Sequence, residues 1–301
     1  MSKTPSELIH EASLVGDIDV LTKVIRENPD AIDIKDRYGS TPLQKALWRG
    51  HSSVIELLVQ SGSKALDIPD NSGSSPMHEA AWNGCASIVE TLIRLGSTSI
   101  DSLCGGSTPL LMAAMNGHVS VIEFLIKYGS NAIDVPDKIG CTPLMWAVTG
   151  GHIMAVKALV RLGSRAIDSP GFDGEAPLHA AVRKGDILMI ETLIQLGSRI
   201  IDTEDRSGST PMCMAVCAGR VSTIEALVRL GSNAIDMLDG YGRTLLELAI
   251  SLKKEECAKT LVALNDKIVE TPAIDEDCRQ EVRFRVYFSR SLVSKLLFFL
   301  D

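Results

Sequence analysis

Nearly the same seven residues recur along this chain at a fixed interval. YGSNAID stands at 128–134, LGSRAID at 162–168, LGSRIID at 196–202 and LGSNAID at 230–236. Alignment on one alanine per unit gives an interval of 34 residues, except for 33 between Ala80 and Ala113. The aligned residues are Ala12, Ala46, Ala80, Ala113, Ala147, Ala181, Ala215 and Ala249. Such a period is typical of stacked repeats, because one short unit cannot bury its own apolar face and must share it with its neighbours.

Each unit is predicted to contain a short helix, a tight turn, a second helix and an extended hairpin. In TPLMWAVTGGH, 142–152, Thr142 is a suitable N-cap, Pro143 suits the first helical position and Gly151 ends the helix. The following segment, HIMAVKALVRLGS, carries apolar residues at helical spacing, which predicts an amphipathic second helix. These residues are Val156, Leu159 and Val160.

The glycine of the LGS segment is predicted to follow the second helix in the left-handed conformation that glycine adopts at low cost. The apolar pair of AID should turn back under the helices, and Asp202, Asp205 and Gly208 supply turn residues for the hairpin. At the two ends of the array, Asn28 and Asn265 take the glycine position and are expected to form left-handed caps. The last second helix, KKEECAKTLVALND, is polar, as the outer face of a terminal repeat must be.

The units resemble the ankyrin repeat. Its TPLHxAAxxGH pattern stands here as SPMHEAAWNGC (75–85), TPLLMAAMNGH (108–118) and APLHAAVRKGD (176–186). The resemblance covers about residues 4–267, in about eight repeats whose terminal ones act as caps. It implies an all-α ankyrin-repeat solenoid, with stacked helix–turn–helix pairs and β-hairpin fingers. The period departs from the usual 33 by one residue, in G-S-x-A-I-D, and DSLCGGST (101–108) has lost one residue and the central Asp of its turn.

Composition narrows the range of partners and compartments. The formal net charge is −8 and the repeats hold no long basic run, which argues against binding to nucleic acid. The seven cysteines show no paired spacing and the chain opens with the polar MSKTPSELIH, so we expect a cytoplasmic or nuclear protein. Because no run of about 18 apolar residues occurs, no integral membrane segment is expected.

The sequence offers no constellation of catalytic or metal-binding residues. All six histidines fall in two repeat slots, for which the family resemblance implies structural hydrogen bonds. Cys213 and Cys217 are one helical turn apart, but a zinc site needs four ligands and no matching pair stands in a neighbouring unit. The recurring aspartates are explained by turns. We therefore predict a protein with no catalytic residues, no metal and no cofactor.

The candidate partner-binding residues are large apolar side chains in two slots beside the aligned alanine. Trp48, Trp82 and Met115 lie two residues after it, and Met112 and Trp146 lie one residue before it. The resemblance places these slots on or beside the concave face, where aromatic and methionine anchors are typical of interface centres. Later units carry basic residues in the corresponding region, so Arg183 is expected to accept an acidic group. Two alternatives stay open: the rings pack between repeats, or the site lies on finger tips around Tyr38, Phe172 and Tyr241.

The sequence therefore predicts a monomeric, non-catalytic scaffold that binds a protein partner of unknown identity through its concave face and hairpin tips. The repeat array is assigned to 1–267 and a non-repeat C-terminal tail to 268–301. Four of the six phenylalanines fall in the last 18 residues, where VRFRVYFSR alternates like a strand and SLVSKLLFFLD could form an amphipathic helix. The alternative is an adaptor whose tail, 279–301, recruits a second partner or a membrane surface.

Overall fold

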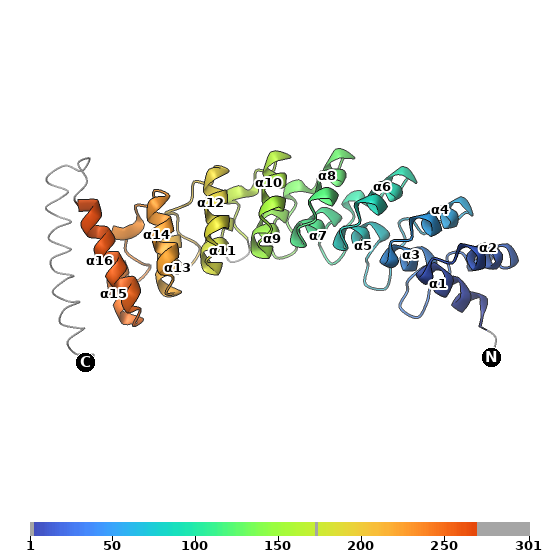
Figure 1. The fold of residues 1–301 in the computed structure, drawn as a ribbon, viewed down its shortest axis with the longest axis horizontal. Coiled ribbons are helices and arrows are strands. Elements are labelled where there is room, and N and C mark those ends of the chain that lie inside the picture. Colours follow the sequence, from blue (N-terminus) through green and yellow to red (C-terminus); the bar gives the residue numbers. More distant parts are fainter. Residues whose placement is uncertain (1–2, 172–173, 270–301) are drawn as a thin grey trace. The chain divides into compact units, whose positions relative to one another are not determined.

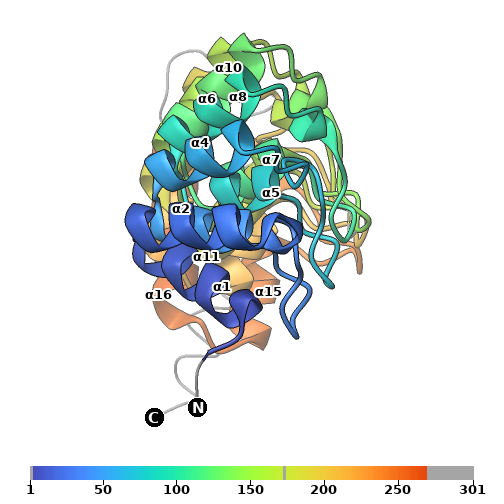
Figure 2. The same ribbon diagram turned by 90° about the vertical axis from the view of Figure 1, so that its right-hand side faces the viewer.

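Pairs of short helices, one pair per repeat, form the described part of this computed structural model, residues 3–171 and 174–269. The chain divides into two units, residues 1–172 and 173–301. Within each unit the first helices contact one another in chain order, and so do the second helices, so that two helical layers result (Figures 1 and 2). In Figure 2 the connecting loops of the first unit project to one side of these layers.

The helices have the following bounds. In the first unit, the first helices are α1 (Pro5–Val15), α3 (Pro42–Arg49), α5 (Pro76–Trp82), α7 (Pro109–Met115) and α9 (Pro143–Gly150), and the second helices are α2 (Ile18–Glu27), α4 (Ser52–Gln60), α6 (Ala86–Arg94), α8 (Val119–Lys127) and α10 (Ile153–Arg161). In the second unit, the first helices are α11 (Pro177–Lys184), α13 (Pro211–Cys217) and α15 (Leu245–Ser251), and the second helices are α12 (Ile187–Gln195), α14 (Val221–Arg229) and α16 (Glu255–Val269).

The first helix of a repeat begins and ends as its sequence predicts. In α9 the Thr142 hydroxyl accepts a hydrogen bond from the Met145 N–H, and Pro143 stands at the first helical position, where no N–H is needed. Gly151 ends the helix in the left-handed conformation, with φ of +78°. The predicted cap, proline and terminating glycine are therefore confirmed.

The core lies between the two helical layers. Val156 and Leu159 of α10 are fully buried, which confirms the predicted amphipathic face, and burial of such a side chain contributes about 1.5–3 kcal/mol. The aligned alanine is buried in every repeat, because the helices approach so closely there that a methyl group fills the space. Its exposed fraction never exceeds 3% at Ala12, Ala46, Ala80, Ala113, Ala147, Ala181, Ala215 and Ala249.

Within each of the two units, the recurring GSxAID segment joins neighbouring repeats by what we call the Asp–Ser link. In this link the Asp carboxylate of one repeat accepts hydrogen bonds from the Ser hydroxyl of the next repeat and from a neighbouring backbone N–H. Asp134, for example, accepts from Ser164 Oγ at 2.5 Å and from the Arg165 N–H at 2.9 Å. The other linked pairs are Asp33–Ser63, Asp67–Ser97, Asp101–Ser130 and Asp202–Ser232. The motif recurs because each copy holds the adjacent repeat.

The link also revises the expected path of the segment. The AID segment forms a 3-10 turn, at Ala132–Asp134 and Ala166–Asp168, and at Asp134 this turn directs the carboxylate to the following repeat. Gly163 precedes this turn with φ of +105°, which confirms the predicted left-handed glycine. A charge-assisted hydrogen bond of this kind contributes about 1.5–3 kcal/mol, comparable to one buried aliphatic side chain.

The fingers are built from turns, and the described residues show isolated β-bridges in place of strand ladders. Asp205 accepts hydrogen bonds from the N–H groups of Ser207 and Ser209, and Gly208 has φ of +76°, so these predicted turn residues are confirmed. The shortened junction, residues 101–108, forms a different turn from the other fingers. Gly105 and Gly106 both have positive φ between the bridged residues 104 and 107, and this tight two-residue turn accounts for the missing residue.

The two asparagine caps expected at the ends of the array were wrong. Asn28 has φ of −141°, because Pro29 follows it and forces the preceding residue toward extended backbone. Asn265 lies inside α16, which continues to Val269, two residues beyond the predicted end of the array. No proline or glycine follows Asn265 before that point to stop the helix. The remainder of the predicted tail, 270–301, lies outside the described residues.

Replacing Asp134 by alanine should lower the free energy of unfolding by about 1–3 kcal/mol, because Ser164 Oγ and the Arg165 N–H lose a charged acceptor. Ser164→Ala should cost less, since Asp134 still accepts from Arg165. Urea denaturation followed by circular dichroism measures both. The effects in the double variant should be less than additive, and full additivity would show that the two side chains do not interact.

Candidate functional site

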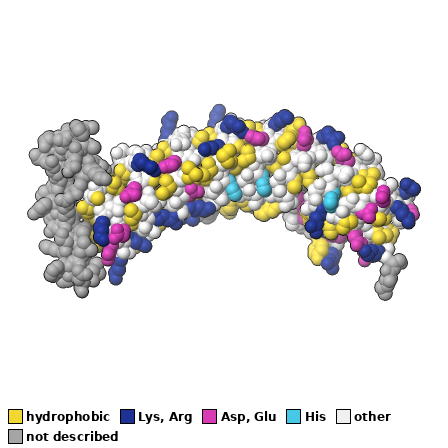
Figure 3. Space-filling model, viewed as in Figure 1, with side chains coloured by type: hydrophobic (Ala, Val, Ile, Leu, Met, Phe, Trp, Pro, Cys, Tyr) yellow, Lys and Arg dark blue, Asp and Glu magenta, His cyan; other side chains and the backbone are white. Residues whose placement is uncertain are grey.

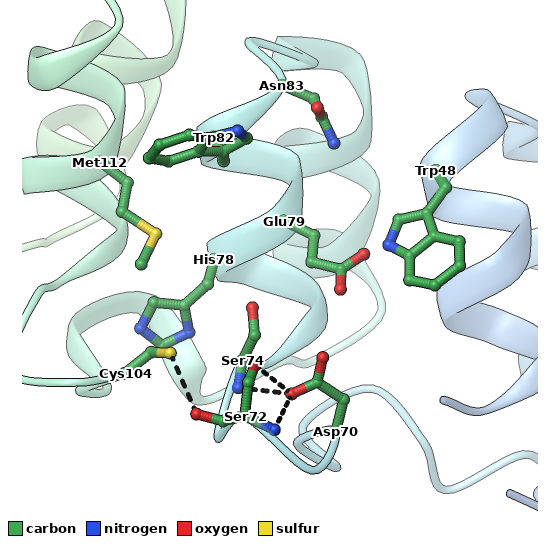
Figure 4. A pocket seen from close by; sticks show the side chains of 10 residues that line it. All are labelled: Trp48, Asp70, Ser72, Ser74, His78, Glu79, Trp82, Asn83, Cys104 and Met112. Atoms are coloured by element: carbon green, nitrogen blue, oxygen red, sulfur yellow. Dashed lines mark hydrogen bonds between the residues drawn. The ribbon is translucent and has the colours of Figure 1, made fainter. Parts of the chain in front are cut away.

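A groove of about 460 Å³ crosses the surface of the first unit at α5 (Figure 4). Its walls come from the facing ends of α3, α5 and α7, and its floor comes from the loops that precede α5 and α7. The residues that line it are Trp48, Asp70, Ser72, Ser74, His78, Glu79, Trp82, Asn83, Cys104 and Met112.

One end of the groove is formed by Trp48. Its side chain is 42% exposed, and its indole N–H points toward the Glu79 carboxylate (Figure 4). The Lys45 ammonium lies 3.9 Å from the centroid of the Trp48 ring and is paired with Asp36 at 2.7 Å. The ring therefore already contacts one cation, whose charge is balanced by a carboxylate of the same repeat.

The opposite end is formed by Trp82 and Met112, above His78. Trp82 is 49% exposed and lies beside Met112, with His78 below it (Figure 4). The His78 ring is buried and fixed at both nitrogens: Nδ1 lies 2.8 Å from Ser75 Oγ, and Nε2 donates to the Ser102 carbonyl at 3.0 Å. Burial lowers the pKa of His78, so the ring is neutral near pH 7.

Asp70 forms the floor near Trp48. Its Oδ1 accepts hydrogen bonds from the Ser72 N–H at 2.8 Å, the Ser72 hydroxyl at 2.6 Å and the Ser74 N–H at 2.9 Å. Burial alone would raise the pKa of Asp70, but the hydrogen bonds from Ser72 and Ser74 outweigh it and lower the pKa. The groove therefore holds one carboxylate that is ionised throughout the neutral range.

Glu79 is the carboxyl of the groove whose surroundings oppose its ionisation. Its Oε2 is out of contact with solvent and has no hydrogen-bond partner among the described residues. Burial, followed by the negative charge of Asp70, raises the pKa of Glu79 to about 7. The Trp48 indole N–H and the Lys45 ammonium act in the opposite direction but do not cancel the effect. Groups with such perturbed pKa values inside a pocket are functional-site candidates.

The groove brings together three of the six predicted partner-binding residues, Trp48, Trp82 and Met112. Met115 is half-buried on α7, outside the lining. Trp146 is half-buried on α9, where its indole N–H donates to Asp137 Oδ2 at 2.8 Å. Arg183 belongs to the second unit, where Nε lies 3.1 Å from Glu175 Oε1 in an ion pair. The finger residues Tyr38 and Tyr241 are 58% and 87% exposed, and Phe172 lies outside the described residues.

Sequence reasoning missed the two carboxylates of the groove. Asp70 has the position of a turn residue, and Glu79 follows the histidine of the repeat motif. A signal was present: Glu79 stands one residue before the aligned Ala80, the slot that Met112 and Trp146 fill in later units. Charged residues fill that slot in the first three repeats, as Glu11, Lys45 and Glu79, and Glu79 is the last of them before the apolar residues of the later units.

A family model described as ankyrin repeats (3 copies) matches residues 9–102, 97–169, 161–237 and 178–271. The chain belongs to the ankyrin repeat family. Among solved structures, it is similar to the crystal structure of human ASB11 ankyrin repeat domain, with a TM-score of 0.65 and 25% sequence identity; the match covers 76% of this chain and 99% of that chain. No curated protein matches the chain significantly. The predicted all-α ankyrin solenoid is confirmed, and ankyrin repeats are generally protein–protein interaction modules.

The histidines that follow the first helices tie ankyrin repeats together. Each donates from Nε2 to a carbonyl of the preceding repeat: His51 to Leu14 at 3.2 Å, His118 to Trp82 at 2.9 Å and His152 to Met115 at 3.0 Å. Figure 3 shows histidine side chains, in cyan, spaced along the surface of the first unit. A structural role is thus confirmed for this slot, and the His118 bond also holds the end of α5 that carries Trp82.

Cys213 is 2% exposed in the core of the second unit, whereas Cys217 reaches the surface of α13. Within residues 3–171 and 174–269, we find no group of three or more His, Cys, Asp or Glu side chains that could hold a metal ion. In the same ranges, none of the ankyrin helices combines the length and the apolar character needed to cross a bilayer.

Glu79→Gln should stabilise the protein in a pH-dependent way. A carboxyl whose pKa rises from 4.5 to about 7 on folding contributes full stability below its unfolded pKa and loses that contribution as pH rises through 7. The glutamine variant should therefore gain about 1–3 kcal/mol at pH 8 and less at pH 5. Urea denaturation at the two pH values measures the gain.

The matched control is Glu90→Gln on α6, which removes the same charge from an exposed position outside the groove. It should shift the denaturation midpoint little at either pH. Equal effects of the two substitutions would contradict the strained environment of Glu79.

Proposed function

We propose that this ankyrin array is a non-catalytic scaffold that binds a protein partner at the groove formed by α3, α5 and α7. The exposure of Trp48 and Trp82 carries the proposal. Tryptophan is among the side chains most often found at the energetic centre of an interface, because it buries a large area at a low entropic cost. Two indoles at 42% and 49% exposure beside one groove form such a centre.

The exposure of the rings also weighs against a role in packing between repeats. That packing is provided by fully buried side chains such as Leu43 on α3 and Met77 on α5, the helices that carry Trp48 and Trp82. A ring that served only to fill the space between repeats would be covered to a similar degree. Met112 is half-buried and flexible, which allows this wall to adapt to a partner side chain.

Met115, Trp146 and Arg183 are proposed as further contacts. Met115 and Trp146 lie on α7 and α9, which pack against each other, so a longer partner segment could follow this layer. Arg183 is paired with Glu175, and an acidic group of the partner would have to displace that carboxylate. The two carboxylates of the groove and the net charge of −8 favour a protein partner over nucleic acid.

We propose that the scaffold needs no cofactor and acts as a monomer in the cytoplasm or nucleus. The alternative of an adaptor rests on the sequence of the tail, 279–301, which lies outside the described residues. Deleting 279–301 leaves α16 complete and separates the two functions. A simple binder keeps every partner on deletion, whereas an adaptor loses one of two.

The double substitution Trp48→Ala, Trp82→Ala should remove the partner without unfolding the repeats. Loss of anchors of this kind weakens binding by about 2 kcal/mol or more, roughly 30-fold. Affinity capture from cell extract with quantitative mass spectrometry, on wild type and variant, measures the loss. Circular dichroism should stay helical.

Met154→Ala is the control, since Met154 is 66% exposed on α10, outside the groove. Proteins retained by wild type and by this control, and lost by the double variant, are the partners at the groove. If the double variant unfolds, the rings are packing residues. If folding and binding both survive, the site lies elsewhere, and Tyr38 and Tyr241 are the next positions to change.

A further inference from the structure

We propose that the groove accepts a basic side chain, lysine or arginine, from an extended partner segment, with its cationic head at Glu79 and Asp70 and an adjacent apolar residue against Trp82 and Met112. This inference rests on the proposed function and specifies the chemistry of the partner. The turn before α5 accounts for Asp70, which accepts hydrogen bonds from Ser72 and Ser74, but no such structural role accounts for the carboxylate of Glu79.

The charged side chains that line the groove are all acidic. Among the described residues that line it, two are carboxylates and none is lysine or arginine. The Lys45 ammonium, which lies over the Trp48 ring, is already paired with Asp36 at 2.7 Å. The groove therefore has negative charge without a cation of its own inside it, which complements a positively charged side chain.

The geometry divides the groove into two parts on either side of α5. Glu79 and Trp82 are three residues apart on one short helix, but Figure 4 shows Glu79 directed toward Trp48 and Asp70, and Trp82 directed toward Met112. Successive side chains of an extended peptide point in opposite directions. Because the two parts of the groove lie on opposite sides of α5, two neighbouring residues of a peptide that crosses α5 can fill one part each. A basic residue with an apolar neighbour fits this division, whereas an acidic residue would meet two carboxylates.

A cation bound beside Glu79 would stabilise its carboxylate, because Oε2 has no hydrogen-bond donor of its own. The buried Oε2 of Glu79 has no donor, and the Trp48 indole N–H and the Lys45 ammonium offset only part of the desolvation cost of the carboxylate. A cation in the groove offsets that cost and favours the ionised form. Because burial raises the pKa of Glu79 to about 7 in the free protein, binding of a cation at lower pH must also release a proton.

Binding should therefore strengthen between pH 6 and pH 8, by up to about tenfold. The surroundings of the other titratable groups beside Glu79 move their pKa values away from neutrality. Hydrogen bonds from Ser72 and Ser74, working against burial, lower the pKa of Asp70, and burial lowers the pKa of His78 and raises that of the Cys104 thiol. The Lys45 ammonium is held in its ion pair.

The test uses the full chain and three synthetic tripeptides: acetyl-Leu-Lys-Leu-amide, its arginine counterpart, and its norleucine counterpart, which has an apolar side chain similar in length to lysine but no charge. The readout is the NMR signal of each tryptophan indole N–H during titration. Trp48 and Trp82 report on the groove, and Trp146, which donates to Asp137 outside it, is the internal control.

The basic peptides should shift the Trp48 and Trp82 signals saturably, leave Trp146 in place and bind at least about tenfold more tightly than the norleucine peptide at pH 8. Glu79→Gln should abolish this preference and the pH dependence, while Glu90→Gln on α6 should keep both. The lower dissociation constant of the two basic peptides, taken from the titration curves, identifies the preferred head group.

Equal affinity for the norleucine and lysine peptides overturns the cation site and leaves the groove as an apolar binding surface. A preference that survives in Glu79→Gln also overturns it, since the cation would then be recognised elsewhere. If no peptide shifts either indole, the inference fails. If, in addition, Trp48→Ala, Trp82→Ala retains the captured partners, the proposed function fails with it.

Discussion

Burial of each repeat's apolar face by its neighbours is the constraint on which the rest of this structure depends. A single helix pair of this length leaves one side of its core uncovered, so every repeat must present the same surfaces as the next. The aligned alanine shows how strict the requirement is, because it is buried in all eight units, from Ala12 to Ala249. Side chains that face away from this contact are free to vary, and Trp48 and Glu79 belong to that set.

The Asp–Ser link fixes the register in which neighbouring repeats pack. Hydrophobic contact between helices tolerates sliding, whereas the carboxylate of Asp134 reaches Ser164 and Arg165 only when the two repeats are in register. The link lies in the G-S-x-A-I-D segment, where the repeat is one residue longer than the usual ankyrin period. Ion pairs also join the second helices, such as Arg94–Glu56 and Arg161–Glu123. In Figure 3, basic and acidic side chains alternate along the edge of the first unit. These pairs are exposed and contribute less than the link.

The candidate site departs from this regularity at a cost in stability. Glu79 takes a slot that is apolar in the next two repeats, and its carboxyl is held in surroundings that oppose its ionisation. Trp48 and Trp82 leave large apolar surfaces in water. Natural proteins place such locally unfavourable groups at functional sites, and the stable array of buried alanines and Asp–Ser links compensates for them.

The amino-acid sequence by itself determined the repeat, the helix pairs and their caps, because proline, threonine, glycine and apolar spacing act over a few residues. The roles of Thr142, Pro143, Gly151 and Gly163 follow from such local patterns alone. Tertiary structure decided what depends on contacts between repeats: the partner of Asp134 and the meeting of Trp48, Asp70 and Glu79 in one groove. Local patterns give a side chain its helix face, but burial and charge at that face are set by the neighbouring repeat, which is why the sequence does not reveal the raised pKa of Glu79.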